Sequence, residues 1–503
     1  MNKYIRIHEN DNVAVALTLL AAGEHISAGG YDIILAEDIP QGHKFALCKI
    51  HSASPVMKYG ACIGLARTDI APGCHVHTHN LRTALNETSE YTYTPEAEAS
   101  CGTSKEAARS AAVRTFQGYL RPDGLAGTRN EIWIIPTVGC VNSVGQHLAS
   151  LAREKYGGIP SIDAIVAFQH PYGCSQLGDD QDNTRKILAD LCMHPNAGGV
   201  LLLGLGCENS GIEEIKAFIP DFEGRQIQCL VCQDVEDEIK EGLALLDGLI
   251  ETASRNQRQP IPVSSLVVGV KCGGSDGLSG ITANPLVGRF TDCLTGDGGS
   301  VLMTEVPEMF GAETLLLNRC MDQEVFQKAA GMIQGFKDYF SRHDQPVYEN
   351  PSPGNKAGGI STLEDKSLGC TQKAGNAAVV DVLDYGEPVK ARGLSLLYGP
   401  GNDLVSSTAL AASGAQLILF TTGRGTPFAA PVPTLKISSN TPLHDKKNRW
   451  IDFNAGTIVE NPDYDMLTDQ LYDYVLRVAG GELVKAEQAG YHDMAIFKQN
   501  ITL

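Results

Sequence analysis

The sequence has no apolar stretch long enough to cross a membrane. No hydrophobic run approaches the roughly eighteen residues that a transmembrane helix needs, and the Met-Asn-Lys-Tyr start has no apolar signal core. We therefore expect a cytoplasmic protein without a membrane partner. Positive charge is also scarce, because 40 Lys and Arg residues stand against 59 Asp and Glu residues, for a net charge of −19. This balance argues against a nucleic-acid partner but leaves room for a local basic pocket that binds an anionic small molecule.

Nucleotide-binding motifs are absent as well. The segment Gly204–Gly211 departs from G-x-G-x-x-G, because Asn209 occupies the position of the third glycine, and no Walker motif occurs. The 14 cysteines are spread too thinly over 503 residues to form the disulfide framework of a small secreted domain. In a reducing compartment they are either buried small hydrophobes or metal and redox ligands. A chain of this length exceeds one core and indicates two to four domains.

The first eighty or so residues predict a small all-β module, because short β-prone runs alternate with Gly, Asp and Pro. The module ends in a histidine-rich stretch that contains His75, His77 and His79. If this stretch is a strand, its period of two places the three imidazoles on one face, which suits a metal or an anionic ligand. A solvated strand end is the alternative. Residues 85–112 are polar and predict a linker or an arm that crosses to another domain.

Four expected strands in the α/β remainder of the chain are each followed by a cysteine, and three of these cysteines directly follow a glycine. The fourth strand, Leu266–Val270, leads into the glycine-rich loop Lys271–Pro285. The carboxyl ends of parallel strands meet at one edge of a sheet, where open α/β proteins bind ligands, so we expect these loops to converge. Burial as a small hydrophobe is the alternative for each cysteine taken singly. Thiolate and imidazole ligands suit iron(II), and the candidate metal ligands are Cys140, His170, Cys174, Cys207 and Cys272.

Several polar loops carry further candidates. A rigid Asn-Pro-Ser-Pro-Gly loop presents Asn355 and Lys356, and Arg424 follows an apolar strand, from which its guanidinium can fork onto a carboxylate. For a single Lys or Arg, a solvated surface position is the alternative. The candidates for binding substrate are Arg129, Lys271, Ser275, Asn355 and Arg424. The candidates for acid–base catalysis are His77, Glu305 and Lys356.

Sequence blocks along essentially the whole chain resemble the altronate/galactarate dehydratase family. They include GHKFAL, HVHTHN, GTRNEIWIIPTVGCVN, HPYGCSQLGDD, GLGCEN, CGGSDGLSGITANP, TEVPEMFGAE, NPSPGNKAGG, LEDKSLGCTQKAG and TTGRGTP. The resemblance implies an α/β protein with a β-clip domain of the SAF type at residues 1–83 and a linker at 84–115. It further implies a second α/β domain at 116–260 and a C-terminal Rossmann-like domain with a mostly parallel sheet, and without a dinucleotide, at 261–503.

The resemblance also implies hydro-lyase chemistry on a sugar acid and dependence on a divalent metal, iron(II) or manganese(II) in its place. The galactarate-type branch lacks the three N-terminal histidines and a cysteine that matches Cys370, so both features favour the altronate branch. The expected reaction converts D-altronate to 2-keto-3-deoxy-D-gluconate in hexuronate catabolism, and we expect a homodimer.

This reaction requires removal of a weakly acidic C2 proton and loss of the C3 hydroxyl. A cation that chelates the carboxylate and a hydroxyl would stabilise the enediolate, while a base reaches C2 and an acid protonates the leaving oxygen. Three or four thiolates could instead hold an Fe–S cluster, and the cysteine spacing does not decide between the two. The functional alternatives are a galactarate dehydratase, a related lyase on another hydroxy acid, and a non-catalytic sugar-acid sensor.

Overall fold

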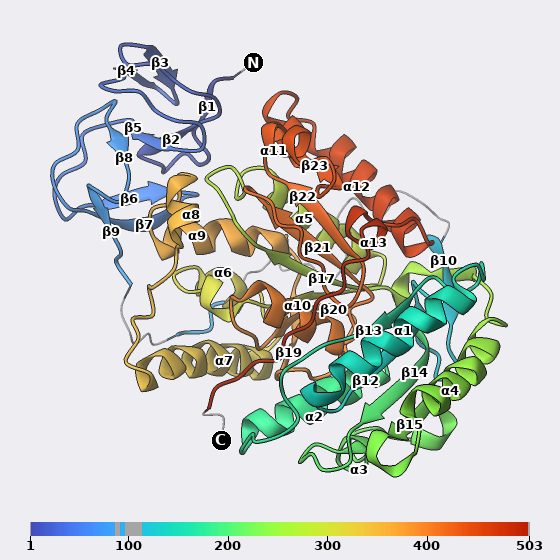
Figure 1. Ribbon diagram of the computed structural model, residues 1–503. Helices are drawn as coiled ribbons and strands as arrows, with labels where there is room; N and C mark the ends of the chain where they lie inside the picture. Colours follow the sequence, from blue (N-terminus) through green and yellow to red (C-terminus); the bar gives the residue numbers. More distant parts are fainter. Residues whose placement is uncertain (1, 86–90, 96–112, 501–503) are drawn as a thin grey trace.

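The computed structural model describes residues 2–85, 91–95 and 113–500. Figure 1 shows a small β domain at one end, a C-terminal α/β domain in the middle and a second α/β domain at the opposite end. The α/β class and the small N-terminal β domain predicted from the sequence are confirmed. Across the described part of the chain, no helix combines the length and the apolar character that crossing a membrane requires.

The small β domain consists of short antiparallel strands. They form a four-stranded sheet in the order β1-β2-β5-β8, a three-stranded sheet β6-β7-β9 and the hairpin β3-β4. The strands are β1 (Tyr4–Ile5), β2 (Val13–Ala16), β3 (His25–Ala28), β4 (Tyr31–Ile34), β5 (Lys44–Ala46), β6 (Pro55–Lys58), β7 (Ala61–Ala66), β8 (His75–Val76) and β9 (Leu81–Arg82). The domain has an apolar cluster of its own around Phe45, and a second cluster extends to Ala312 and Leu368 of the C-terminal domain.

The segment predicted as a linker falls largely on residues 86–90 and 96–112, which lie outside the described residues. Its described part contacts the C-terminal domain. The Tyr91 hydroxyl donates to Glu313 Oε1 at 3.0 Å, and the Tyr93 hydroxyl donates to the carbonyl of Cys320 at 2.6 Å. These contacts anchor residues 91–95 along the surface of the C-terminal domain.

The second domain contains a parallel four-stranded sheet in the order β13-β12-β14-β15. Beside it, β10, β11 and β16 form a separate antiparallel sheet that joins the two ends of this segment. The strands are β10 (Thr115–Leu120), β11 (Ala126–Gly127), β12 (Glu131–Pro136), β13 (Ile165–Ala167), β14 (Ala197–Gly204), β15 (Ile227–Val231) and β16 (Gln259–Pro262). The helices are α1 (Asn142–Tyr156), α2 (Asp179–Cys192), α3 (Ile212–Lys216) and α4 (Glu238–Ala253).

The C-terminal domain is built on a seven-stranded parallel sheet in the order β19-β20-β18-β17-β21-β22-β23. Its strands are β17 (Val267–Cys272), β18 (Ser300–Met303), β19 (Val379–Leu383), β20 (Gly393–Leu397), β21 (Leu417–Thr422), β22 (Thr434–Ser438) and β23 (Phe453–Asn454). Its helices are α5 (Ala283–Gly296), α6 (Glu313–Leu317), α7 (Gln323–Arg342), α8 (Pro353–Ala357), α9 (Leu363–Cys370), α10 (Asp403–Ala412), α11 (Thr441–Lys446), α12 (Tyr464–Ala479) and α13 (Lys485–Gln488).

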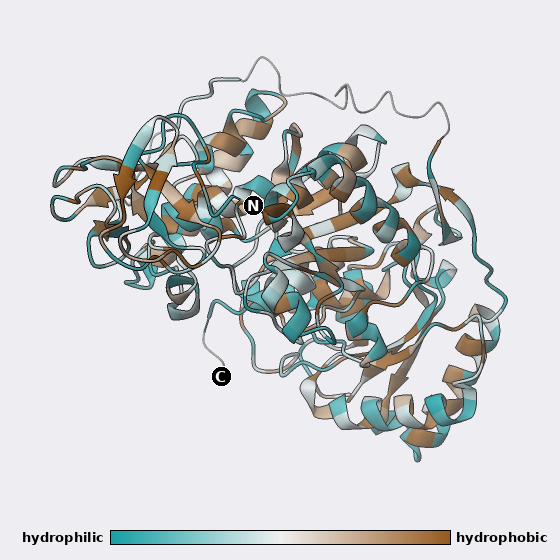
Figure 2. Ribbon diagram, turned by 90° about the horizontal axis from the view of Figure 1, so that it is seen from above, coloured by the Kyte–Doolittle hydropathy of each residue, from teal (hydrophilic) through white to brown (hydrophobic). Residues whose placement is uncertain are grey.

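The central strands of this sheet are buried along their whole length, as expected for a parallel sheet with helices on both faces. Figure 2 shows these apolar strands enclosed by helices with polar outer faces. The strand order runs from β17 through β18 in one direction and from β21 through β22 in the other. The order therefore reverses between β17 and β21, and their carboxyl ends form the crevice where ligands bind in open α/β sheets.

The small β domain docks at this crevice through a buried ionic contact. Lys44 Nζ on β5 lies 2.8 Å from Asp365 Oδ2 on α9, and Lys58 Nζ on β6 lies 3.0 Å from Asp365 Oδ1. All three side chains are at most 2% exposed. Burial opposes ionisation of Asp365, but Lys44 and Lys58 outweigh it and hold the pKa of this carboxyl well below its usual range. Asp365 therefore stays ionised and neutralises two lysines from the neighbouring domain.

We expect Asp365→Asn to destabilise the docked small domain by about 3–5 kcal/mol, because it leaves two buried ammonium groups without their anion. Calorimetry would show a lower unfolding temperature. The pKa of Asp365 is lower in the folded protein than in the unfolded chain. Its ionised carboxylate therefore contributes fully to the free energy of unfolding above the unfolded pKa of about 4, and this contribution is lost as the pH falls below that value. The exposed Asp69, which pairs with Lys49, is the matched control. An Asp69→Asn variant that loses as much stability would contradict the prediction.

Candidate active site

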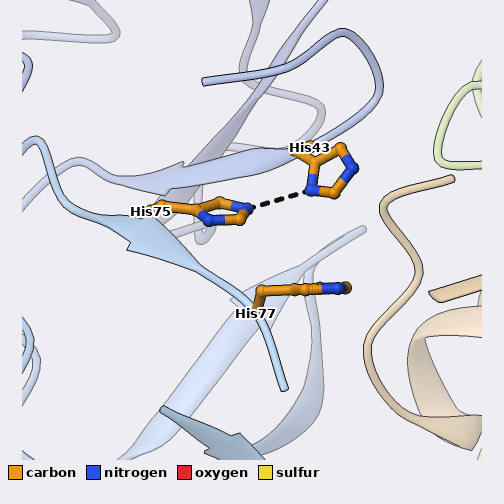
Figure 3. Close-up of side chains that lie close together, drawn as sticks. All are labelled: His43, His75 and His77. Atoms are coloured by element: carbon orange, nitrogen blue, oxygen red, sulfur yellow. Dashed lines mark hydrogen bonds between the residues drawn. The ribbon is translucent and has the colours of Figure 1, made fainter. Parts of the chain in front are cut away.

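Three histidine side chains of the small β domain meet at its boundary with the C-terminal domain. His75 lies on β8, which pairs with β5 next to His43, and His77 follows β8 directly. His43 Nδ1 and His75 Nε2 are 2.9 Å apart (Figure 3). One ring nitrogen from each of the three residues lies within 4.8 Å of the others. The group therefore has the size of a site for a single metal ion.

The composition of this group differs from the sequence-based prediction. Strand β8 ends at Val76, because the Asn80 side chain accepts from the His77 amide and donates to the His75 carbonyl, closing a turn. The period of two is thus broken before His79, whose ring centroid lies 5.6 Å from that of His75 but which is outside the compact group. His43, from a neighbouring strand, takes the third position.

The protonation and orientation of these rings favour a cation. His43 Nε2 lies 3.4 Å from the carbonyl of Ala357, which can only accept, so Nδ1 is left with its lone pair directed at His75. His77 Nδ1 contacts Ser361 Oγ at 2.9 Å, which leaves Nε2 available. Burial lowers the pKa of His75 to about 3 and of His77 to about 4, reinforced by neighbouring cations and imidazoles. Neutral imidazoles whose second nitrogen is held by protein oxygen are typical metal ligands.

Four of the sequence-predicted residues lie beside this group. The side-chain amide of Asn355 on α8 donates to the Ser275 carbonyl at 2.8 Å, which ties α8 to the loop after β17. Lys356 is the next residue on α8 and is half-buried. A Cβ on Gly354 would lie 3.5 Å from Cδ of Arg424, so Arg424 reaches the same helix from the loop after β21. The two carboxyl-end loops and α8 therefore share one rim.

A narrow cavity at this boundary connects the two domains. It is lined from the small β domain by Lys58 and Tyr59, and from the C-terminal domain by residues that include Ser275, Asp276, Asp365, Lys366 and Cys370. Close backbone approach is needed here: the Gly277 amide donates to the Gly358 carbonyl at 2.7 Å, and a Cβ on Gly277 would collide with the carbonyl of Gly42. Only glycine permits this approach.

A second compact donor group lies deeper, in the C-terminal domain. Cys272 and Cys370 have their sulfur atoms 3.3 Å apart, and each lies within 3.3 Å of Glu308 Oε2. Lys373 Nζ is 2.9 Å from Cys272 Sγ, and Lys366 Nζ is 2.7 Å from Glu308 Oε1. Two ammonium groups thus already neutralise this group, so its donors suit a metal cation less well than the three imidazoles do.

The charges in this deeper group are strongly coupled to one another. Burial opposes ionisation of Glu308, but Lys366 and Lys373 outweigh it and bring the pKa of its carboxyl to about 2. The hydrogen bond with Cys272 and then burial raise the pKa of the Cys370 thiol. The Cys370 thiol therefore stays protonated next to the ionised Glu308.

Two predicted residues, Lys271 and Glu305, contact each other in the core rather than lining the cavity. Lys271 Nζ lies 2.9 Å from Glu305 Oε1 and 2.7 Å from Asp403 Oδ1, and the Cys272 amide donates to Glu305 Oε2 at 3.0 Å. Burial raises the pKa of Glu305, with Glu308 adding to the effect. Glu305 has φ of +71°, a left-handed conformation that is strained for a residue with a side chain. Its role is to fix the end of β17 next to the site.

Two other predicted residues are held by contacts elsewhere. The guanidinium of Arg129 donates to both oxygens of Glu487 and to the carbonyls of Val478 and Glu482, which anchors α12 and α13 to the second domain. His170 is buried, with Nε2 2.8 Å from the carbonyl of Pro136 and Nδ1 accepting from the Tyr172 amide. The expectation that Arg129 binds substrate and His170 binds metal is not met by these positions, because their polar atoms are already engaged.

The predicted cysteine ligands do not form one cluster. Cys272 joins Glu308 and Cys370 in the C-terminal domain, whereas Cys140, Cys174 and Cys207 are exposed in the second domain. The physical reason is that the chain builds two separate parallel sheets, each with its own carboxyl edge.

Comparison with known proteins accounts for the whole chain. Family models match three consecutive parts: the altronate/galactarate dehydratase SAF domain at residues 2–84, the D-galactarate dehydratase/altronate hydrolase second domain at 118–254 and the D-galactarate/altronate dehydratase C-terminal domain at 263–502. An altronate dehydratase of Bacillus subtilis (strain 168) is 51% identical over 504 residues, covering 100% of both chains. The chain belongs to the altronate/galactarate dehydratase family.

Two relatives from Escherichia coli (strain K12) extend the comparison. An altronate dehydratase is 47% identical over 501 residues and 100% of both chains, and a galactarate dehydratase (L-threo-forming) is 33% identical over 98% of this chain and 96% of its own length. The protein is therefore a carbon–oxygen lyase, a hydro-lyase that dehydrates a sugar acid.

Sequence reasoning missed several residues of the two compact donor groups. His43 stands 32 positions before His75, and no local pattern connects them. Lys366, Cys370 and Lys373 were detectable, because their spacing of four and then three places them on one face of a helix. Charged residues on the buried face of a helix are uncommon, and this was the available signal.

We expect His75→Ala and His77→Ala to weaken Mn(II) binding strongly. Even changes to outer-shell partners of metal ligands cost about 10- to 100-fold in affinity, so loss of an imidazole should cost at least as much. The loss of the free-Mn(II) electron paramagnetic resonance signal during titration measures the affinity.

Two controls accompany this titration. His51→Ala removes an exposed imidazole that lies against Asp69, and Cys272→Ser alters the deeper donor group. Both should bind Mn(II) as the unaltered protein does. Unchanged affinity in His75→Ala, or a loss confined to Cys272→Ser, would place the cation elsewhere.

Proposed function

We propose that the protein dehydrates D-altronate to 2-keto-3-deoxy-D-gluconate. The observation that carries this proposal is the three-histidine group, which faces helix α8, the helix that carries Lys356 and is approached by Arg424 in the C-terminal domain. The relatives add support, since two full-length altronate dehydratases are 51% and 47% identical, against 33% for the galactarate dehydratase.

We infer that iron(II), or manganese(II) in its place, would be held by His43, His75 and His77. Their donor set fits, because three neutral nitrogen ligands suit a borderline divalent ion and leave coordination positions for substrate oxygens. When bound, such a cation would stabilise the enediolate that forms when C2 loses its proton. His77 then acts as a ligand rather than as the acid–base residue expected from the sequence.

The cationic side chains at the rim supply the other requirements. The planar guanidinium of Arg424 matches a carboxylate and would orient C1 of the substrate. The ammonium of Lys356 carries a proton near the same rim and would deliver it to the C3 oxygen as the C3–O bond breaks. The C3 oxygen leaves as water with the proton from Lys356, while the C2 proton passes to a general base and restores the Lys356 ammonium through solvent, so that one water is lost overall. The resulting enol takes a proton at C3 and releases its hydroxyl proton to give the 2-keto-3-deoxy acid.

We expect metal-stripped protein to convert D-altronate to 2-keto-3-deoxy-D-gluconate only after anaerobic addition of iron(II). Galactarate, assayed in parallel, should react much more slowly, since the histidine group favours the altronate branch. Product formation is followed by a colorimetric assay for 2-keto-3-deoxy acids. Preferred turnover of galactarate would overturn the substrate assignment, and tight altronate binding without turnover would indicate a sensor.

We expect Lys356→Met to lower kcat by about 10²- to 10⁴-fold, the usual contribution of a general acid, while Mn(II) binding stays unchanged. Steady-state kinetics at saturating iron(II) measures the effect. Lys328→Met, on the exposed face of α7, is the matched control because that lysine pairs with Glu324 in the same helix, away from α8. If Lys356→Met retained kcat and changed KM alone, Lys356 would bind the carboxylate instead of donating a proton.

A further inference from the structure

Three cysteines of the second domain are set apart by their exposure. Among the described residues, Cys140, Cys174 and Cys207 are exposed, whereas every other cysteine is buried or partly buried. Cysteine is among the most buried residue types, and packing does not explain a thiol at the surface. All three follow the carboxyl ends of strands in the same parallel sheet.

The register of this sheet brings the three cysteines to one edge. Strand β12 lies between β13 and β14 (Figure 1). Ile134 on β12 pairs with both Ala167 and Leu201. Cys140 follows Ile134 by six residues, and Cys207 follows Leu201 by six residues as well. Cys174 follows Ala167 by seven. Adjacent strands lie about 4.8 Å apart, so the loops that carry the three cysteines leave the same edge of the sheet from neighbouring strands.

Direct contacts join the loops that carry these thiols. The Gly139 amide donates to the Tyr172 carbonyl at 2.9 Å, which links the first loop to the second. The Ser210 amide donates to the Gly173 carbonyl at 3.0 Å, and Cys174 Sγ lies 3.5 Å from Asn209 Oδ1, which links the second loop to the third.

Glu208 completes the connection between the first and third loops. Its carboxylate accepts from the Thr137 hydroxyl at 2.5 Å and from the amides of Leu205 and Gly206 at 3.0 and 2.6 Å. These bonds use the carboxylate for positioning and hold its pKa below the usual range, against the effect of burial. The three thiols therefore stand on a rigid platform of mutually bonded loops.

We propose that Cys140, Cys174 and Cys207 bind a [4Fe–4S] cluster. In the described part of the chain, the donor groups compact enough for a single ion are the histidine group and the Cys272 group, and these three thiols form neither. Three thiols on neighbouring loops that bond to one another are a ligand set that can hold a polynuclear cluster, because cysteine thiolates are the ligands of iron–sulfur clusters. Three protein ligands leave one iron open to a small oxygen ligand. This proposal does not depend on the histidine site.

The test is anaerobic reconstitution of the full-length protein with iron(II) and sulfide, followed by desalting and assay of both elements. We expect about four iron and four labile sulfide per chain in the cluster, together with the broad visible absorption and the reduced-state electron paramagnetic resonance signal of a [4Fe–4S] centre. Cys140→Ser, Cys174→Ser and Cys207→Ser should each lose the sulfide and the spectra.

Matched variants separate this site from the others. Cys229→Ser and Cys232→Ser change partly buried cysteines of the same domain, and His75→Ala changes the proposed iron(II) site. All three should keep the sulfide and the spectra. The proposal is wrong if the reconstituted unaltered protein takes up no labile sulfide, if two of the three thiols form a disulfide instead, or if the Cys140, Cys174 and Cys207 variants keep the cluster. Failure of altronate turnover with intact cluster signals would affect only the proposed function.

Discussion

The architecture depends on one buried carboxylate. Asp365 receives an ammonium group from each of two strands of the small β domain, and no part of this triad reaches solvent. A buried ion pair of this kind contributes modestly compared with apolar packing, but loss of one partner is severe. The triad therefore specifies how the small domain sits, because any other docking would leave at least two charges buried without a partner. The same placement directs the histidines at α8.

Buried charges in the adjacent part of the C-terminal domain are also paired with opposite charges. Buried or nearly buried lysines at 44, 58, 271, 366 and 373 are opposed by the carboxylates of Asp365, Glu305 and Glu308 and by the partly exposed Asp403. Asp276, which lines the cavity, brings the carboxylates to five, so the five lysines are matched in number. Lys356 and Arg424 at the rim add positive charge to the crevice of a protein whose net charge is −19. A sugar-acid carboxylate thus meets local positive potential although the surface as a whole is acidic. Composition alone cannot reveal such an inversion.

Much of the fold could be predicted from the sequence, because apolar runs followed by glycine-rich loops predict parallel strands and their carboxyl edges. That rule also placed Ser275, Asn355 and Arg424, the residues proposed for substrate binding, in loops that the structure brings together. The rule does not show which strands share a sheet. Cys140 and Cys272 were therefore predicted to lie in one cluster, although they follow strands of two different sheets. The rule also could not foresee that Asn80 would close a turn after β8 and replace His79 by His43, since that outcome depends on tertiary pairing.

The glycine before each exposed cysteine has a physical reason that the sequence pattern alone does not show. A Cβ on Gly139 would lie 2.8 Å from the His170 carbonyl, and one on Gly173 would lie 2.1 Å from the Thr137 carbonyl. Gly206 adopts φ of +124°, which residues with side chains rarely reach. In the first two loops the glycine permits backbone contact with the neighbouring loop, and in the third it permits the turn. The cysteine that follows each glycine is exposed. The Gly-Cys pair therefore combines close packing of the loop backbone with a thiol at the surface.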